Sequence, residues 1–192
     1  IQSIEVSRPV ETLEFSNHGE LLAIALSGSE TESDAIQLFN ITLMEMTTLQ
    51  STANAFPKDI AWSPDDTLLA IPNPNNGVDL IRTSTMELER SLSGGHNTDV
   101  TCIDFTSNGG HILSGDESGR LLMWNADGTE TNKQWELNSE VASCGFDPTD
   151  TRVASLTTNG QLDTMSFAGG SLQTSSFTSG SSLSWSSNGA YL

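Results

Sequence analysis

Short runs of apolar residues, separated by turn-forming residues, return along the chain with a period of about forty residues. Each copy places an aromatic residue at the end of one apolar run, Gly or Asp four residues later, and then a second apolar run. Gly and Asp tolerate the unusual backbone angles of tight turns, so the pattern predicts strand, turn, strand. The aromatic anchors are Phe15, Trp62, Phe105, Phe146 and Trp185.

A third strand follows in each complete copy, and a more polar fourth strand can be placed in two of them. Helical periodicity is almost absent. Four strands are too few to bury both faces of a sheet alone, and packing such sheets face to face in a ring is the known solution. The third strands are expected at 35–40, 77–83, 119–125 and 160–167, and the fourth at 86–92 and 132–138.

The sequence therefore predicts an all-β fold, a β-propeller of four-stranded antiparallel blades with about four complete blades and partial blades at both ends. Strands covered on both faces explain the continuous apolar run of "RLLMW" after its Arg. We expect a single domain, 1–192, with approximate repeats 7–49, 50–92, 93–137 and 138–177 and a partial repeat 178–192.

The third copy, residues 95–125, reads "GHNTDVTCIDFTSNGGHILSGDESGRLLMWN" and resembles the WD40 repeat. It has the Gly-His pair, the inner strand ending in Phe105, the Ser-Gly of the second strand, a glycine turn and Trp124. Because WD40 rings usually have about seven blades, the resemblance implies a piece of a larger propeller whose parent chain supplies further blades. Such a piece should be marginally stable or associate, whereas a stable monomer would favour a small closed ring.

A structural hydrogen-bond network is the second implication of the resemblance. In WD40 repeats it joins a His before the first strand, a Ser or Thr in the second, an Asp in the following turn and a Trp in the third. His96, Ser114 and Trp124 match these positions. The turn Asp is replaced by Ser118, with Asp116 two residues earlier. We therefore expect His96 to act in structure and not as a base.

The charge balance is strongly acidic, with 25 Asp plus Glu against seven Lys plus Arg and a net charge of −18. Such a field repels phosphate backbones, so no nucleic-acid partner is expected. Two explanations of the acidity stay open: a solvated surface suited to high salt, which we favour, and attraction of a basic partner.

Neither a membrane-spanning stretch nor a signal peptide can be found in the sequence. Membrane insertion is therefore not expected. The compartment stays unknown, with a cytoplasmic location favoured over a secreted one. Cys102 and Cys144 match no metal spacing and are too few for a disulfide framework, so we predict two buried free thiols.

Motifs of catalysis and cofactor binding are missing, including nucleophile elbows, Walker loops and dinucleotide fingerprints. Residues 30–34 offer carboxylates, but without the alternation and Gly of a calcium loop. We therefore predict no enzyme, no cofactor and no metal. Trp135, in an outer strand, is the one tryptophan that could face a partner, although packing on a neighbouring blade is favoured.

The leading hypothesis is a non-catalytic interaction scaffold that binds a protein or peptide through loops between blades and between second and third strands. A basic partner is one option, since these loops carry acids and amides. The alternative is an accessory or gating propeller of a larger hydrolase or peptidase, or of a periplasmic TolB-like protein. A permanent structural scaffold in a large assembly is a third possibility. The candidate partner-facing residues are Glu30, Glu32, Asp34, Asn75, Asn76, Asn97, Asp99 and Glu117.

Overall fold

The computed structural model describes residues 3–6, 8–27, 35–50, 58–129, 133–168 and 173–192. Within them the chain forms four antiparallel sheets of four strands and no helix. Blade 1 holds β1 (Val10–Phe15), β2 (Leu21–Leu26), β3 (Ala35–Asn40) and β4 (Glu45–Gln50), and blade 2 holds β5 (Ala61–Trp62), β6 (Leu68–Asn73), β7 (Gly77–Arg82) and β8 (Glu87–Leu92). Blade 3 holds β9 (Val100–Phe105), β10 (His111–Asp116), β11 (Arg120–Asn125) and β12 (Gln134–Glu136), and blade 4 holds β13 (Val141–Phe146), β14 (Arg152–Thr157), β15 (Gln161–Ser166) and β16 (Gln173–Ser176).

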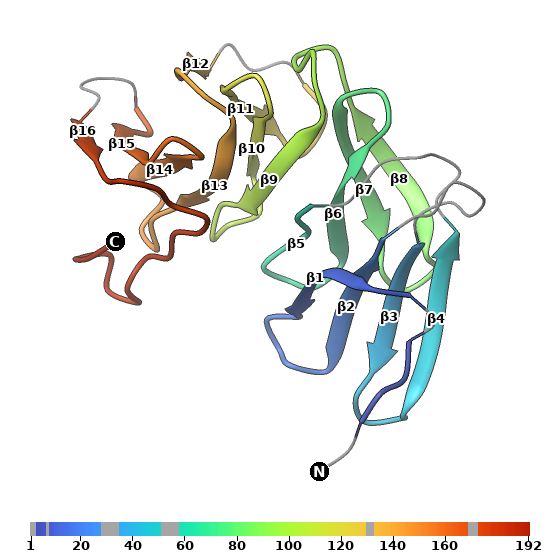
Figure 1. Ribbon diagram of the computed structural model, residues 1–192. Helices are drawn as coiled ribbons and strands as arrows, with labels where there is room; N and C mark the ends of the chain where they lie inside the picture. The colour runs from blue at the N-terminus through green and yellow to red at the C-terminus, as the bar shows by residue number, and fades with distance from the viewer. Residues whose placement is uncertain (1–2, 7, 28–34, 51–57, 130–132, 169–172) are drawn as a thin grey trace.

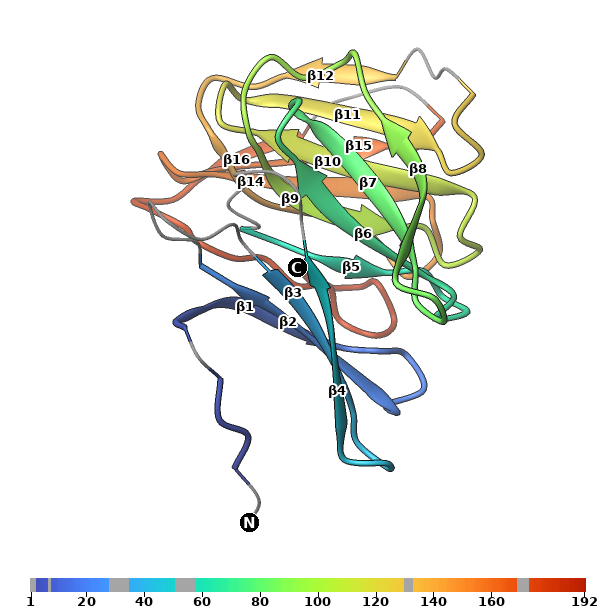
Figure 2. The same ribbon diagram turned by 90° about the vertical axis from the view of Figure 1, so that its right-hand side faces the viewer.

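The four blades lie side by side along an arc, as Figure 1 shows. In each blade the strands pair in chain order, so the first and fourth strands are the two edges. The view in Figure 2 shows the blades stacked one on the next. This arrangement confirms the predicted all-β propeller of four-stranded blades.

The tight turn after each aromatic anchor has the predicted backbone in all five copies. The residue four positions after the anchor has φ between 54° and 72° in every case. Glycine adopts this left-handed region without steric cost, and Asp is among the few other residues that tolerate it. These residues are Gly19, Asp66, Gly109, Asp150 and Gly189.

The two end segments differ from the expectation of partial blades. Residues 182–192 form the predicted turn, in which the Ser186 amide donates to the Tyr191 carbonyl at 2.9 Å, but no strand extends from it. Residues 3–6 precede the first complete repeat, where a partial blade is expected, and they are also without strand structure. A two-stranded hairpin alone is only marginally stable, and the segment 182–192 has no third strand to pair with among the described residues.

Apolar side chains fill the spaces between neighbouring blades. Trp62, at 5% exposure, packs between blades 1 and 2, Phe105 between blades 2 and 3, and Phe146 between blades 3 and 4. Phe15 is 59% exposed, although Val6 packs against the buried Ile24 and Leu26 of the same blade. Trp135 is half-buried and packs against the cluster between blades 3 and 4.

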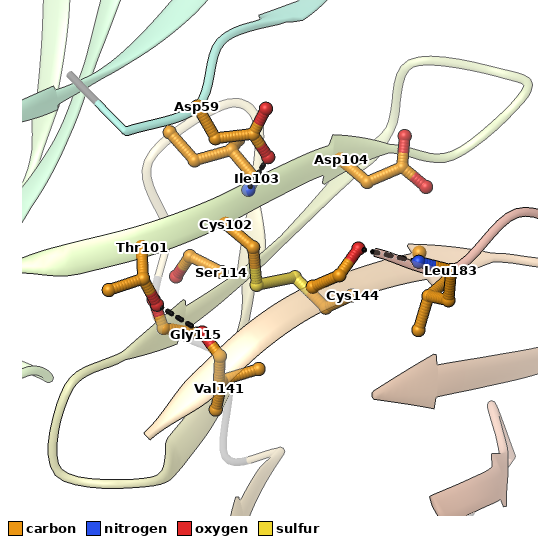
Figure 3. Close-up of a disulfide and its surroundings, with 12 residues drawn as sticks. Asp59, Thr101, Cys102, Ile103, Asp104, Ser114, Gly115, Val141, Cys144 and Leu183 are labelled. Carbon is orange, nitrogen blue, oxygen red and sulfur yellow. Dashed lines mark hydrogen bonds between the residues drawn. A yellow bond between two sulfur atoms is a disulfide. The ribbon is translucent and has the colours of Figure 1, made fainter. Parts of the chain in front are cut away.

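The two cysteines form a disulfide, which corrects the prediction of free thiols. Cys102 on β9 and Cys144 on β13 have their Cα atoms 5.9 Å apart, and the bond joins blade 3 to blade 4 (Figure 3). Their separation of 42 residues is one more than the 41 between the anchors Phe105 and Phe146, so the two side chains lie on opposite faces of equivalent strands and face each other between the blades. Beside the bond, the Thr101 hydroxyl donates to the Val141 carbonyl at 2.6 Å. The first strands of these blades are thus fixed both covalently and by a hydrogen bond.

Candidate functional site

The turns between second and third strands and the connections between blades lie at one end of the sheets, because consecutive strands are antiparallel. We call this end the loop face. In the described residues it includes exposed Asn75, Asn97, Asp99 and Glu117, and half-buried Asn76. The predicted residues Glu30, Glu32 and Asp34 fall outside the described part of the chain.

The loop face is held rigid by contacts between its own segments. The Glu117 amide donates to the Asp99 carbonyl at 3.1 Å, which ties the β10–β11 turn to the connection between blades 2 and 3. In blade 2 the amide of Asn75 donates to the side chain of Asn73 at 3.0 Å. Exposed polar side chains therefore project from fixed backbone, which lowers the entropic cost of binding a partner.

One lysine spans three blades on the loop face. Lys58, which leads into β5, places its Nζ 2.7 Å from Oε1 of Glu117 and 3.3 Å from Oε1 of Glu140. These acids belong to the turn of blade 3 and to the connection that leads into blade 4. All three side chains are substantially exposed, so each ion pair contributes little to stability. Lys58 does, however, neutralise part of the acidity of this face.

The expected hydrogen-bond network of blade 3 is assembled in the interior. His96 Nε2 lies 2.7 Å from the Ser114 hydroxyl oxygen, and the Trp124 indole N–H donates to the same oxygen at 2.7 Å. Trp124 therefore donates to Ser114, whose hydroxyl proton can point at an unprotonated His96 Nε2. This chain joins the connection before blade 3 to its second and third strands.

Asp116, and not a residue of the following turn, completes the network. Its Oδ2 lies 2.9 Å from His96 Nδ1, while its Oδ1 accepts hydrogen bonds from both the amide and the hydroxyl of Ser118. Burial would raise the pKa of Asp116, but the hydrogen bonds from His96, Ser118 and the Arg120 amide outweigh it and lower this pKa to about 2. Ser118 thus stands where WD40 repeats have the turn Asp, and it donates hydrogen bonds to Asp116, which takes over the role of that Asp.

This Ser, His and Asp set has the connectivity of a nucleophilic triad but lacks its access. The Ser114 residue is fully buried, and the side chains of His96 and Asp116 have no exposed surface. The hydroxyl oxygen of Ser114 is also occupied by the indole of Trp124. The arrangement therefore supports the blade and offers no reacting group to a substrate.

Substitution Ser114→Ala is expected to lower the free energy of unfolding by about 2 kcal/mol, because it leaves the Trp124 indole N–H and His96 Nε2 without their buried partner. Chemical denaturation with tryptophan fluorescence measures the change. Ser91→Ala is a control, since this exposed serine makes a single side-chain bond, to Asp79. Equal stability of the two variants would contradict a supporting role of the network.

Two further acids, which the sequence did not single out, connect blades through backbone amides. Asp59 accepts from the Ile103 amide at 2.9 Å (Figure 3), and Asp104 accepts from the Phe146 amide at 2.7 Å. Burial raises the pKa of Asp59 to about 6. Burial, assisted by the negative charges of Asp59 and Asp150, raises the pKa of Asp104 to about 7. Each acid therefore links its own blade to the next at a cost in desolvation.

The described residues hold no group of three or more His, Cys, Asp or Glu arranged to bind a metal ion. In the same part of the chain there is no helix of the length and apolarity that crossing a membrane requires.

The family described as "IFT140 first beta-propeller" matches residues 1–158. Among curated proteins, the chain is similar to the guanine nucleotide-binding protein subunit beta-2 of Caenorhabditis elegans, at 32% identity over 69 residues, 34% of this chain and 18% of that protein. It is also similar to the flagellar L-ring protein of Xanthomonas campestris pv. campestris strain B100, at 32% identity over 113 residues, 53% of this chain and 49% of that protein. The chain thus spans less than half the length of these relatives. With four propeller blades and a match over most of its length, the chain belongs to the IFT140 first β-propeller family of WD40-type propellers.

Proposed function

We propose that this chain is a non-catalytic scaffold that binds a protein or peptide partner on its loop face. The observation that carries the proposal is the set of exposed Asn75, Asn97, Asp99 and Glu117 side chains on backbone fixed by internal hydrogen bonds. Strands of the blades are occupied with packing, so function falls to such loops. The buried Ser114 network gives no reason to expect chemistry.

The proposed partner is basic at the contact with this face. The chain carries a net charge of −18, and Asp99 and Glu117 are exposed acids of the loop face. A lysine or arginine of the partner would take the place of Lys58 at Glu117 and Glu140. Because exposed ion pairs are weak, the loss of the Lys58 pairs costs little free energy of binding. Electrostatic attraction of this kind favours fast association and falls with added salt.

The double variant D99N/E117Q is expected to weaken binding of a basic peptide about fivefold, because it removes two exposed charges worth up to about 1 kcal/mol each. An array of lysine- and arginine-containing peptides identifies the binder, and calorimetry at two salt concentrations measures its affinity. The control E20Q/D127N makes the same charge change at the opposite end of the blades. Equal weakening by both variants, or binding that does not fall with salt, would overturn the proposal.

A further inference from the structure

A groove of about 410 Å³ opens between the outer part of blade 1 and the β7–β8 turn of blade 2. Leu21 and Leu38 of blade 1 and Met86 of blade 2 line it and continue the apolar cluster between these blades. Glu45 and Thr47 of β4 line its blade 1 side. None of the described residues that line this groove is Lys or Arg.

The equivalent space between blades 3 and 4 contains a lysine. Lys133 directly precedes β12, and its Nζ donates to the Phe167 carbonyl at 2.5 Å, in the β15–β16 turn of the next blade. The same Nζ lies 4.2 Å from the centroid of the Phe167 ring. A cationic side chain thus crosses from the outer strand of one blade to the turn of the next.

The space between blades 2 and 3 contains an arginine at the equivalent place. Arg90 of β8 lies over the β11–β12 turn of blade 3, where a Cβ added at Gly128 would be 2.8 Å from Arg90 Cδ. Strand register shows that the two cations are equivalent: Arg90 pairs with Leu80, and the Lys133 carbonyl accepts from the amide of Met123. Leu80 and Met123 in turn pair with Ala70 and Leu113 on the second strands.

In blade 1 the equivalent position is Thr47. It pairs with Leu38, and Leu38 pairs with Ala23 on the second strand, as in the other two blades. A threonine is too short to cross to the β7–β8 turn, so the space that Arg90 and Lys133 fill elsewhere is left as the groove. One carboxylate, Glu45, lines the groove. A second, Glu87, directly follows the lining residue Met86 in the sequence.

We propose that this groove binds a lysine or arginine side chain of a partner peptide, which takes the place that Arg90 and Lys133 hold in the neighbouring blades. The aliphatic part of the side chain would lie on Leu38 and Met86, and the charged end would reach Glu45 and the carbonyls of the β7–β8 turn. This surface is formed largely by the β3–β4 and β7–β8 turns, at the end of the blades opposite the loop face, and it goes beyond the proposed function.

The test uses capped pentapeptides of alanine with a central arginine, lysine or norleucine. Methyl NMR of Met86 and Leu38 follows binding to the chain, with a dissociation constant on the order of 1 mM expected for a single anchoring side chain. The arginine and lysine peptides should shift these methyl signals, and the norleucine peptide should not. An equal shift by norleucine, or no shift by any peptide at saturating concentration, would overturn the proposal.

Matched variants separate the groove from general charge effects. T47K supplies the missing cation from within the chain and should weaken binding of the arginine peptide about tenfold, whereas T48K adds the same charge at the adjacent residue and should change it less than about twofold. E45Q should weaken binding about threefold without altering the blade. Equal effects of T47K and T48K would contradict the groove. D99N/E117Q should leave this binding unchanged, so a failure here is distinct from a failure of the loop-face proposal.

Discussion

Replacement of Cys102 and Cys144 by alanine is expected to lower the free energy of unfolding by about 4 kcal/mol. This is the free-energy equivalent of the conformational entropy that a cross-link over 42 residues removes from the unfolded chain. For a chain of this size the loss corresponds to a melting temperature lower by roughly 10 °C. The disulfide also holds the first strands of blades 3 and 4 together, so separation of these blades should begin at lower temperature in the variant.

Calorimetry with and without dithiothreitol measures this effect and supplies its own control. Reductant should lower the melting temperature of the original chain, because the disulfide is reduced to two thiols, and should leave the double-alanine variant unchanged. Thiol titration of the denatured, unreduced chain should find no free thiol. Two reactive thiols, or a melting temperature indifferent to reductant, would contradict the disulfide.

Raising the pH from 5 to 8 is expected to destabilise the chain, because Asp104 and Asp59 become ionised in a buried setting. Their pKa values are raised to about 7 and about 6 from 3.8. A raised pKa in the folded state contributes stability that is complete below about pH 4 and is lost as the pH rises through 6 and 7. For Asp104 the shift corresponds to roughly 4 kcal/mol as an upper limit.

Glu14 acts in the same direction, since partial desolvation and the charges of Asp59 and Asp104 raise its pKa to about 8. The residue is nevertheless exposed at the surface, where solvent screens these charges, so its effect on stability is small. Asp116 opposes the trend only in strong acid: its pKa is lowered to about 2, so its contribution is lost as the pH falls from about 4 towards 2. Stability should therefore be greatest near pH 4 to 5.

The variant D104N isolates the largest part of this pH dependence. Its amide oxygen can still accept from the Phe146 amide, and it carries no charge at any pH. D104N should be more stable than the original chain at pH 8 and should lose most of the difference between pH 5 and pH 8 in urea denaturation. D127N is the control: Asp127 is exposed, and its hydrogen bonds from Thr129 lower its pKa, so it stays ionised throughout this range. An unchanged pH slope in D104N would contradict burial of its charge.

The repeat could be predicted because each blade satisfies its own local rules. The aromatic anchor, the positive-φ residue four positions later and the second apolar run are all local, and all five copies carry them. Polar outer strands were harder to place. β12 and β16 have few apolar positions, since their outer side faces water.

Contacts between blades could not be predicted from the sequence, because they depend on which positions face across the arc. Cys102 and Cys144 are about one repeat apart on equivalent strands, which in a propeller makes them neighbours, and this spacing was the available signal for the disulfide. Asp104 looks like a polar residue on an alternating strand, yet it faces the amide of Phe146 on the next blade. Asp116 replaced the expected turn acid because its side chain reaches His96 from the end of β10.

The network residues of blade 3 could be predicted from the resemblance to the WD40 repeat. No motif in the sequence pointed to Lys58. Its role depends on two acids 59 and 82 residues away in sequence. The absence of a long cation at Thr47 becomes visible only when the fourth strands are aligned by register, since β4, β8 and β12 share little sequence.

The disulfide also determines how the chain responds to proteolysis. The exposed turns at 107–108 and 127–129 both lie between Cys102 and Cys144, and exposed turns are preferred sites of cleavage. A single cut at either turn would produce two polypeptides that migrate together under non-reducing conditions and separate only after reduction. Strand pairing within blade 3 would hold the nicked molecule in register, so cleavage there need not release any fragment.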